Sequence, residues 1–305
     1  MPTTNKVTAK ARTDRAQLGI MMMLVAYLCL ALVDTSAKYL VLLGLPVFQV
    51  VFMRYVGHFA LSLGVIGRGG FAWQRFATDH VGLVMLRSTL LVSSTVLNFI
   101  VLRYLSLTLV SAIMFAAPIL VCALSWPLLG ERVGPWRWVA IVVGFCGVLV
   151  VIRPFNEGFQ WAVILPVVNA LAMALYSILT RRLSGIVATE TMQLYSGGLG
   201  TIVMLPFAIA TWQTPANSLD WALLLGLGLW GWSGHELLTR AHGFAPANIL
   251  MPYTYSFMIY LTITSYLVFD HIPDQWTLIG AGIIVVSGLM IWWRENLQRT
   301  RNASD

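Results

Sequence analysis

Residues 104–133 read YLSLTLVSAIMFAAPILVCALSWPLLGERV. The part from Leu105 to Leu129 contains no charged side chain, has Pro118 in its middle, and is followed by Gly130 and Glu131. A helix needs about 20 apolar residues to cross the hydrocarbon core of a bilayer. This stretch therefore predicts a membrane-spanning helix that ends at a polar loop.

The composition of the whole chain supports the same prediction. Hydrophobic residues make up 58% of the 305 residues and charged residues 10%, and the mean hydropathy is +0.79. Soluble domains carry roughly a quarter charged residues. We therefore expect an all-α membrane protein with ten spans and no room for a soluble catalytic domain. The expected spans are Gln17–Leu40, Pro46–Gly67, His80–Leu102, Leu105–Leu129, Trp136–Ile152, Phe159–Thr180, Glu190–Thr211, Leu219–Thr239, Ala247–Phe269 and Trp276–Trp293.

Basic residues are distributed unequally between the two sides that ten spans define. Of the 19 lysines and arginines, 14 lie in the two tails and in the loops of the same side. The opposite side has three, Lys38, Arg103 and Arg153, and the remaining two, Arg54 and Arg87, lie within spans. Because cytoplasmic loops are enriched in lysine and arginine, the imbalance predicts that both termini are cytoplasmic. Basic residues at span ends, rather than on one face, also argue against a nucleic-acid partner.

The second half of the chain repeats the order of features in the first half. Asn98–Tyr104 aligns with His235–Ala241, and Pro127–Val133 aligns with Tyr266–Ile272. Since each half holds five spans, an odd number, the halves are expected to lie inverted relative to each other in the bilayer. Inverted repeats are typical of secondary transporters, whose substrate site lies between the two halves.

Three features around the fourth span resemble the hallmark of the EamA family, which belongs to the drug/metabolite transporter superfamily. They are the small residues Ser111 and Ala112, the mid-helix Pro118, and the pair Gly130-Glu131 in the following loop. The resemblance covers nearly the whole chain as two repeats, residues 17–152 and 159–293, between cytoplasmic tails 1–16 and 294–305. The second repeat departs from the pattern, because Phe269-Asp270 replaces the Gly-Glu pair and Pro252 is the nearest counterpart of the mid-helix proline.

This resemblance implies a carrier in the inner membrane of a bacterium. Such a carrier moves a small-molecule substrate by alternating access, needs no cofactor, and works as a monomer. The aromatic content is most similar to bacterial exporters of aromatic amino acids, so export of amino acids, including aromatic and apolar ones, is the expected function. Exporters of cationic drugs and carriers of nucleotide-linked metabolites remain alternatives within the superfamily. From other classes, the alternatives are a membrane-embedded enzyme and a receptor or scaffold without transport.

Charged residues inside the spans each need an explanation, because each costs about 2.5–3.5 kcal/mol on insertion scales. Asp34 and Lys38 are four residues apart near the outer end of the first span, which allows a local ion pair on one helix face or an outer gate. Arg87 either extends to the cytoplasmic surface or attracts a substrate carboxylate. For Arg54 we favour a structural role.

The alignment of the halves places Asn98 opposite His235. Glu236 and Arg240 are four residues apart, so they are expected to form an ion pair. An alternative interpretation gives His235 or Glu236 a proton to carry, because histidine titrates near neutral pH. The sequence HELLT lacks the second histidine of a zinc motif, so no metal is expected.

Helical spacing groups further residues on faces that could line a central cavity. Aromatic side chains with one polar atom suit a substrate that has both an apolar and a polar part. The expected cavity residues are Arg87, Asn98, Ser111, Phe115, Asn169, Tyr176, Trp232, His235, Tyr253 and Tyr260, with Asp34, Lys38, Pro118, Glu131 and Pro252 in structural or gating roles. On this spacing Tyr255 points away from the face that Tyr253 and Tyr260 share.

Overall fold

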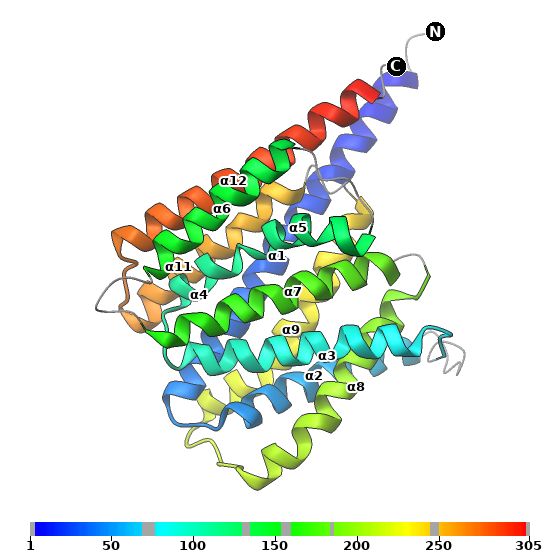
Figure 1. The fold of residues 1–305 in the computed structure, drawn as a ribbon. Helices are drawn as coiled ribbons and strands as arrows, with labels where there is room; N and C mark the ends of the chain where they lie inside the picture. The colour runs from blue at the N-terminus through cyan, green and yellow to red at the C-terminus, as the bar shows by residue number, and fades with distance from the viewer. Residues whose placement is uncertain are drawn as a thin grey trace.

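The structure is a computed structural model that describes residues 4–68, 77–129, 135–153, 160–183, 186–244 and 250–302. Regular secondary structure in these residues is entirely helical, and helices cover all ten predicted spans (Figure 1). The elements are α1 (Thr4–Leu42), α2 (Val47–Arg68), α3 (Val81–Leu102), α4 (Leu107–Met114), α5 (Ala117–Leu129), α6 (Pro135–Ile152), η2 (Trp161–Val163), α7 (Ile164–Leu183), α8 (Thr189–Ala210), α9 (Ser218–Phe244), η3 (Met251–Tyr255), α11 (Ser256–Phe269) and α12 (Gln275–Asn302).

The length and composition of the helices suit a bilayer. Within the described residues, five helical stretches are long and apolar enough to cross a membrane: Gln17–Leu42, Val47–Val65, Val81–Leu102, Trp161–Thr180 and Thr189–Ala210. Large apolar side chains also lie on the outside, where Ile202, Ile209 and Leu267 are each about 70% exposed. Such a surface is unfavourable in water and favourable against lipid.

The fourth and ninth spans are broken rather than continuous helices. The fourth divides into α4 and α5 at the turn formed by Phe115 and Ala116, and the ninth divides into the 3-10 helix η3 and α11. The prolines explain the positions, because proline has no N–H to donate to the carbonyl four residues earlier but is tolerated in the first turn of a helix. Pro118 lies in the first turn of α5, and Pro252 near the start of η3.

Most of the major helix contacts join the first half of the chain to the second, and they occur in related pairs. α1 packs against α9 while α3 packs against α7, and α2 packs against α9 while α3 packs against α8. If each span is replaced by the span five positions away in the chain, the contact α1–α9 becomes α7–α3, and the contact α2–α9 becomes α8–α3. The contacts α2–α8, α4–α11 and α6–α12 are each converted into themselves.

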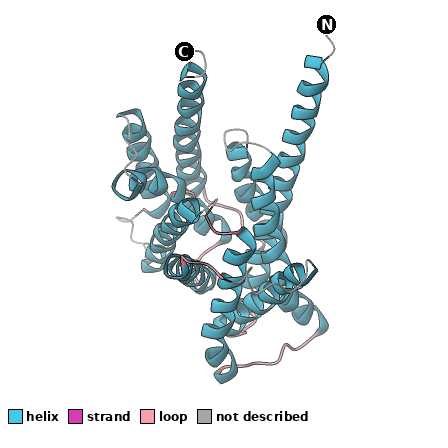
Figure 2. Cartoon of the chain, turned by 90° about the vertical axis from the view of Figure 1, so that its right-hand side faces the viewer, coloured by secondary structure: helices cyan, strands magenta, loops and turns pink. Residues whose placement is uncertain are grey.

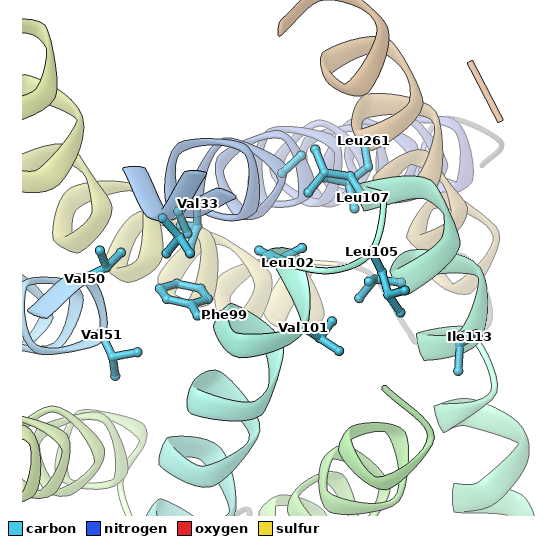
Figure 3. Packing of buried hydrophobic residues seen from close by; sticks show 14 of the residues in the cluster. Val33, Val50, Val51, Phe99, Val101, Leu102, Leu105, Leu107, Ile113 and Leu261 are labelled. Carbon is cyan, nitrogen blue, oxygen red and sulfur yellow. The ribbon is translucent and has the colours of Figure 1, made fainter. Parts of the chain in front are cut away.

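The hydrophobic core joins helices that are distant in the sequence. Figure 3 shows buried side chains that converge from several helices, including Val33 of α1, Val50 of α2, Phe99 of α3, Leu107 of α4 and Leu261 of α11. The two halves therefore share one core. The first turns of α1 and the last turns of α12 project at the same end of the molecule (Figure 2), as an even number of spans requires.

Glycines allow α6 and α12 to approach closely. A Cβ atom added at Gly147 would lie 2.9 Å from Ile284 Cγ1, and one added at Gly280 would lie 2.7 Å from the carbonyl oxygen of Gly147. The contact is completed by the hydroxyl of Ser287, which donates to the carbonyl oxygen of Ala140 over 2.5 Å. Gly282, two residues further along α12, takes no part in this contact, because no atom lies within 4 Å of a Cβ added there.

Gly280 and Gly282 therefore form a matched pair for a stability test. We expect Gly280→Ala to lower the free energy of unfolding by about 1–3 kcal/mol, because the new methyl group overlaps the backbone of α6. Gly282→Ala should leave it unchanged or raise it slightly through better helix propensity. Thermal unfolding of both purified variants in the same detergent is the measurement, and equal melting temperatures would contradict the packing described here.

Candidate functional site

One face of α3 carries a continuous row of polar side chains, which we call the α3 stripe: Arg87, Ser88, Ser94, Thr95 and Asn98. Their spacing of one, seven, eight and eleven residues from Arg87 keeps them on a single helix face. All are buried except Asn98, which is partly exposed. Their bonds reach α1, α2, α7 and α8, so the stripe connects both halves of the chain.

Arg87 is held by the second half of the chain. Its Nη2 donates to the hydroxyl of Tyr176 over 2.6 Å, and its Nε donates to Thr180 Oγ1 over 2.8 Å. Its Nη1 donates to Ser196 Oγ over 3.1 Å and to the carbonyl oxygen of Met192 over 3.4 Å. The side chain is only 3% exposed, so it does not extend to the membrane surface as one interpretation of the sequence suggests.

A third bond joins the stripe to α7. Ser94 donates to Asn169 Oδ1 over 2.5 Å, and Asn169 is 1% exposed. Two of the predicted cavity residues, Asn169 and Tyr176, thus bind the α3 stripe directly.

Asp34 and Lys38 do not form the local ion pair that their spacing allows. Asp34 accepts a hydrogen bond from Asn98 Nδ2 over 3.0 Å. Lys38 donates to the carbonyl oxygen of Leu105 over 2.5 Å and lies 5.4 Å from the ring centroid of Phe269. Both side chains have partners on other elements, which residue spacing within one helix does not predict.

Around the middle of α2, polar atoms are buried without partners. Arg54 Nη1 donates to Thr95 Oγ1 over 2.6 Å, but Arg54 Nε has no partner. His58 Nε2 and Gln193 Oε1 are also buried and unpartnered. The ring of His235 lies 6.2 Å from that of His58, between α9 and α2.

The two broken spans meet through an aromatic contact. Phe115, in the turn between α4 and α5, packs on Tyr255 at the junction of η3 and α11, with ring centroids 5.3 Å apart. Gly288 of α12 makes room for the Tyr255 hydroxyl. Helical spacing predicts that Tyr255 points away from the face of Tyr253 and Tyr260, but it does not predict the contact with Phe115.

The other predicted residues are more scattered. Ser111 is buried and donates to the carbonyl oxygen of Thr108, Trp232 is partly buried on α9, and Tyr260 packs on the main core. Tyr253 packs in a separate cluster with α1 and α9. The expected Glu236–Arg240 ion pair forms, with Arg240 Nε 2.8 Å from Glu236 Oε1. Glu131 lies outside the described residues.

A cavity of about 450 Å³ opens where the loop after α3, the end of α6 and the starts of η2 and α12 come together. Arg153 pairs with Asp274 at its edge. Partial burial opposes ionisation of Asp274, but hydrogen bonds from Thr277 and the nearby Arg153 hold its pKa below the usual value. This cavity lies at helix ends and contains none of the residues predicted for the central cavity.

Sequence reasoning missed Ser88, Ser94, Thr95, His58 and Gln193. Hydroxyl groups are common in membrane helices, so single serines and threonines attract little attention. The helical spacing of Ser88, Ser94 and Thr95 relative to Arg87 and Asn98 is the sequence pattern that predicts a shared polar face. His58 shares a face of α2 with Arg54, four residues earlier.

Comparisons with known proteins were made for the whole chain. A model of the EamA-like transporter family matches residues 17–153 and 160–293. A riboflavin transporter of Vibrio cholerae is 30% identical over 288 residues, which cover 93% of this chain and 96% of that protein. An S-adenosylmethionine uptake transporter of Rickettsia prowazekii is 30% identical over 62% of this chain and 64% of that protein.

Two more distant similarities complete the comparison. A pseudopaline exporter of Pseudomonas aeruginosa is 25% identical over 80% of this chain and 85% of that protein. A solved crystal structure with 17% sequence identity has a TM-score of 0.59 and covers 92% of this chain and 96% of that one. The second similarity shows a shared fold.

We expect Arg87→Met to be much more destabilising than Arg240→Met. The first change leaves buried partners of the guanidinium unsatisfied, at about 1–3 kcal/mol for each lost partner. The second removes an ion pair in which the Arg240 side chain is 58% exposed, where such pairs contribute about 0–1 kcal/mol. Thermal unfolding in detergent compares the two, and similar melting temperatures would refute a bridging role for Arg87.

Proposed function

We propose that this chain, which belongs to the EamA-like transporter family, is a secondary transporter for small metabolites that combine a flat aromatic ring with a polar chain. The family match agrees with the resemblance found in the sequence. We further propose that the protein works as a monomer in the inner membrane of a bacterium. Both termini are then cytoplasmic, as the distribution of basic residues favours.

The observation that carries this proposal is the meeting of the two broken spans at Phe115 and Tyr255. Broken helices at corresponding positions of two repeats are a mark of the substrate site in transporters. The positions correspond here, because Tyr255 follows Phe115 by 140 residues and Asp270 follows Glu131 by 139. The two rings offer a ligand a flat apolar surface at this meeting point.

We propose that the two halves are inverted repeats that rock against each other around this site. The exchange of helix contacts when spans are shifted by five positions supports that arrangement. The glycine-lined contact between α6 and α12 then joins the halves beside the aromatic pair, because Gly288 of α12 accommodates the Tyr255 hydroxyl.

The names of the relatives narrow the candidate substrates. Riboflavin and S-adenosylmethionine, the named substrates of two relatives, both join a flat heteroaromatic ring to a polar chain. Aromatic amino acids have the same two parts, and their export is the function expected from the sequence. A cationic drug is disfavoured, because Glu236, the carboxylate suggested for it, is paired with Arg240.

Transport into proteoliposomes tests the proposal. Labelled riboflavin, S-adenosylmethionine, tryptophan, phenylalanine and a cationic dye are offered to the purified protein, with empty liposomes as the control. We expect movement of at least one aromatic metabolite and not of the dye. If none of the aromatic metabolites moves in either direction, the proposed function is wrong.

Phe115→Ala and Tyr255→Ala should each reduce transport at least tenfold, because each removes half of the aromatic surface. Tyr266→Ala is the matched control, since Tyr266 is 53% exposed on the outer surface of α11. Melting temperatures identify variants that fail to fold. Normal transport by both site variants would exclude the aromatic pair from the site. The same assay on Tyr176→Ala and Tyr253→Ala tests the wider predicted cavity.

We propose that His235 or Glu236 couples transport to protons. The same proteoliposome assay tests this proposal. His235→Gln should then abolish the difference in transport rate between liposomes with and without a pH gradient, because glutamine cannot carry the proton. Glu236→Gln with Arg240→Gln tests the second residue without leaving an unpaired charge. A pH dependence that persists in both variants would contradict coupling at these positions.

A further inference from the structure

The polar atoms around the middle of α2 suggest how the substrate is recognised. We propose that Arg54, His58 and Gln193 form a binding subsite for the amino-acid head group of the substrate, a carboxylate with a neighbouring ammonium. This inference rests on the proposed transport function. It separates substrates with that head group, such as tryptophan, from substrates without it, such as riboflavin.

The three residues come together at the contact between the halves. Arg54 and His58 are four residues apart on one face of α2, and Gln193 belongs to α8, which packs on α2. The side chain of His58 interacts with that of Gln193, and the charge of Arg54 acts on His58. Gly197 of α8 allows the two helices to approach closely. A Cβ atom added at this position would lie 3.0 Å from the backbone of Phe59.

Each of the three residues carries one buried atom without a hydrogen-bond partner: Arg54 Nε, His58 Nε2 and Gln193 Oε1. The residues are 6%, 2% and 6% exposed. An unsatisfied buried polar group destabilises the folded protein, so three such groups in one place indicate a functional site. Ligand sites are places where stability is commonly given up for function.

The charge of the cluster favours an anion. Arg87 makes four hydrogen bonds with its partners, whereas Arg54 donates from Nη1 to Thr95 and its guanidinium lies 5.1 Å from the ring centroid of Tyr55. Asp34 lies within electrostatic range of Arg54 but is bound to Asn98 and makes no ion pair with Arg54 in the described structure. Arg54 thus retains an unpartnered donor, Nε, for a ligand.

The unpartnered atoms match an amino-acid head group by donor and acceptor type. Arg54 Nε–H and His58 Nε2–H can donate to the two oxygens of a carboxylate. Gln193 Oε1 can accept from the ammonium. Riboflavin has neither group, while S-adenosylmethionine has both.

The test measures binding and transport with matched ligands. Tryptophan is compared with tryptophanamide, which lacks the carboxylate, with indole-3-propionate, which lacks the ammonium, and with riboflavin. We expect tryptophan to raise the melting temperature of the purified protein and to be transported. The amide and the propionate should be at least tenfold weaker competitors of tryptophan transport.

Gln193→Leu distinguishes a binding role from a structural one. Removing a buried unpaired acceptor should leave the melting temperature unchanged or raise it, while tryptophan transport falls at least tenfold. Arg54→Lys, which keeps the charge but lacks Nε, should weaken tryptophan binding in the same way. His271→Gln, at an exposed position outside the cluster, is the control and should behave as the parent protein.

The outcomes separate this inference from the proposed function. If riboflavin is transported and the head-group ligands neither compete nor stabilise, the transporter assignment stands and the subsite is wrong. Unchanged tryptophan transport in Gln193→Leu and Arg54→Lys would also refute the subsite. If no aromatic metabolite moves, both proposals fail.

Discussion

A guanidinium group that is buried inside a bundle of membrane helices has to find its hydrogen-bond partners within the protein, because the bilayer core offers none. Arg87 meets this requirement with a tyrosine, a threonine, a serine and a backbone carbonyl, all from α7 and α8. The rest of the α3 stripe follows the same rule, with Ser94 on Asn169 and Asn98 on Asp34. The contact between the halves is therefore directional as well as apolar, which fixes how α3 is rotated.

Two other places in the structure lack the helical continuity or the hydrogen bonds found along the α3 stripe. At Phe115 and Tyr255 two spans lose helical continuity, and at Arg54, His58 and Gln193 buried atoms lack partners. Continuous helices and satisfied polar groups would be the more stable choice at both places. Departures from local stability occur most often at functional sites, and the neighbouring helices here are regular. We therefore propose that both places belong to the transport pathway.

Much of the fold could be predicted from the sequence, because hydrophobic length and the distribution of basic residues are local signals. Described helices lie within each of the ten expected spans, whereas the turn at Phe115 and Ala116 interrupts the fourth span, which the sequence predicts as one helix. The partners of individual side chains could not be predicted in the same way. Asp34 and Lys38 satisfy a helix-spacing rule, yet each has a partner on another element. Gly280 and Gly282 are equally suited to close packing, but only the rotation of α12 decides which of them faces α6. The contact of Tyr255 with Phe115, which helical spacing does not predict, likewise depends on how the two broken spans pack together.

The contact between Phe115 and Tyr255 has a consequence for the energetics of the cycle. If the halves exchange their conformations as proposed, the position held by a phenyl ring in one end state is held by a phenol in the other. The hydroxyl of Tyr255 is accommodated by Gly288 of α12, and no equivalent hydroxyl exists on Phe115. The two end states are therefore related by shape but differ in chemistry, and symmetry does not make them equally populated. Under the proposed exchange, a difference in population between the inward-open and outward-open states would originate at this pair of rings.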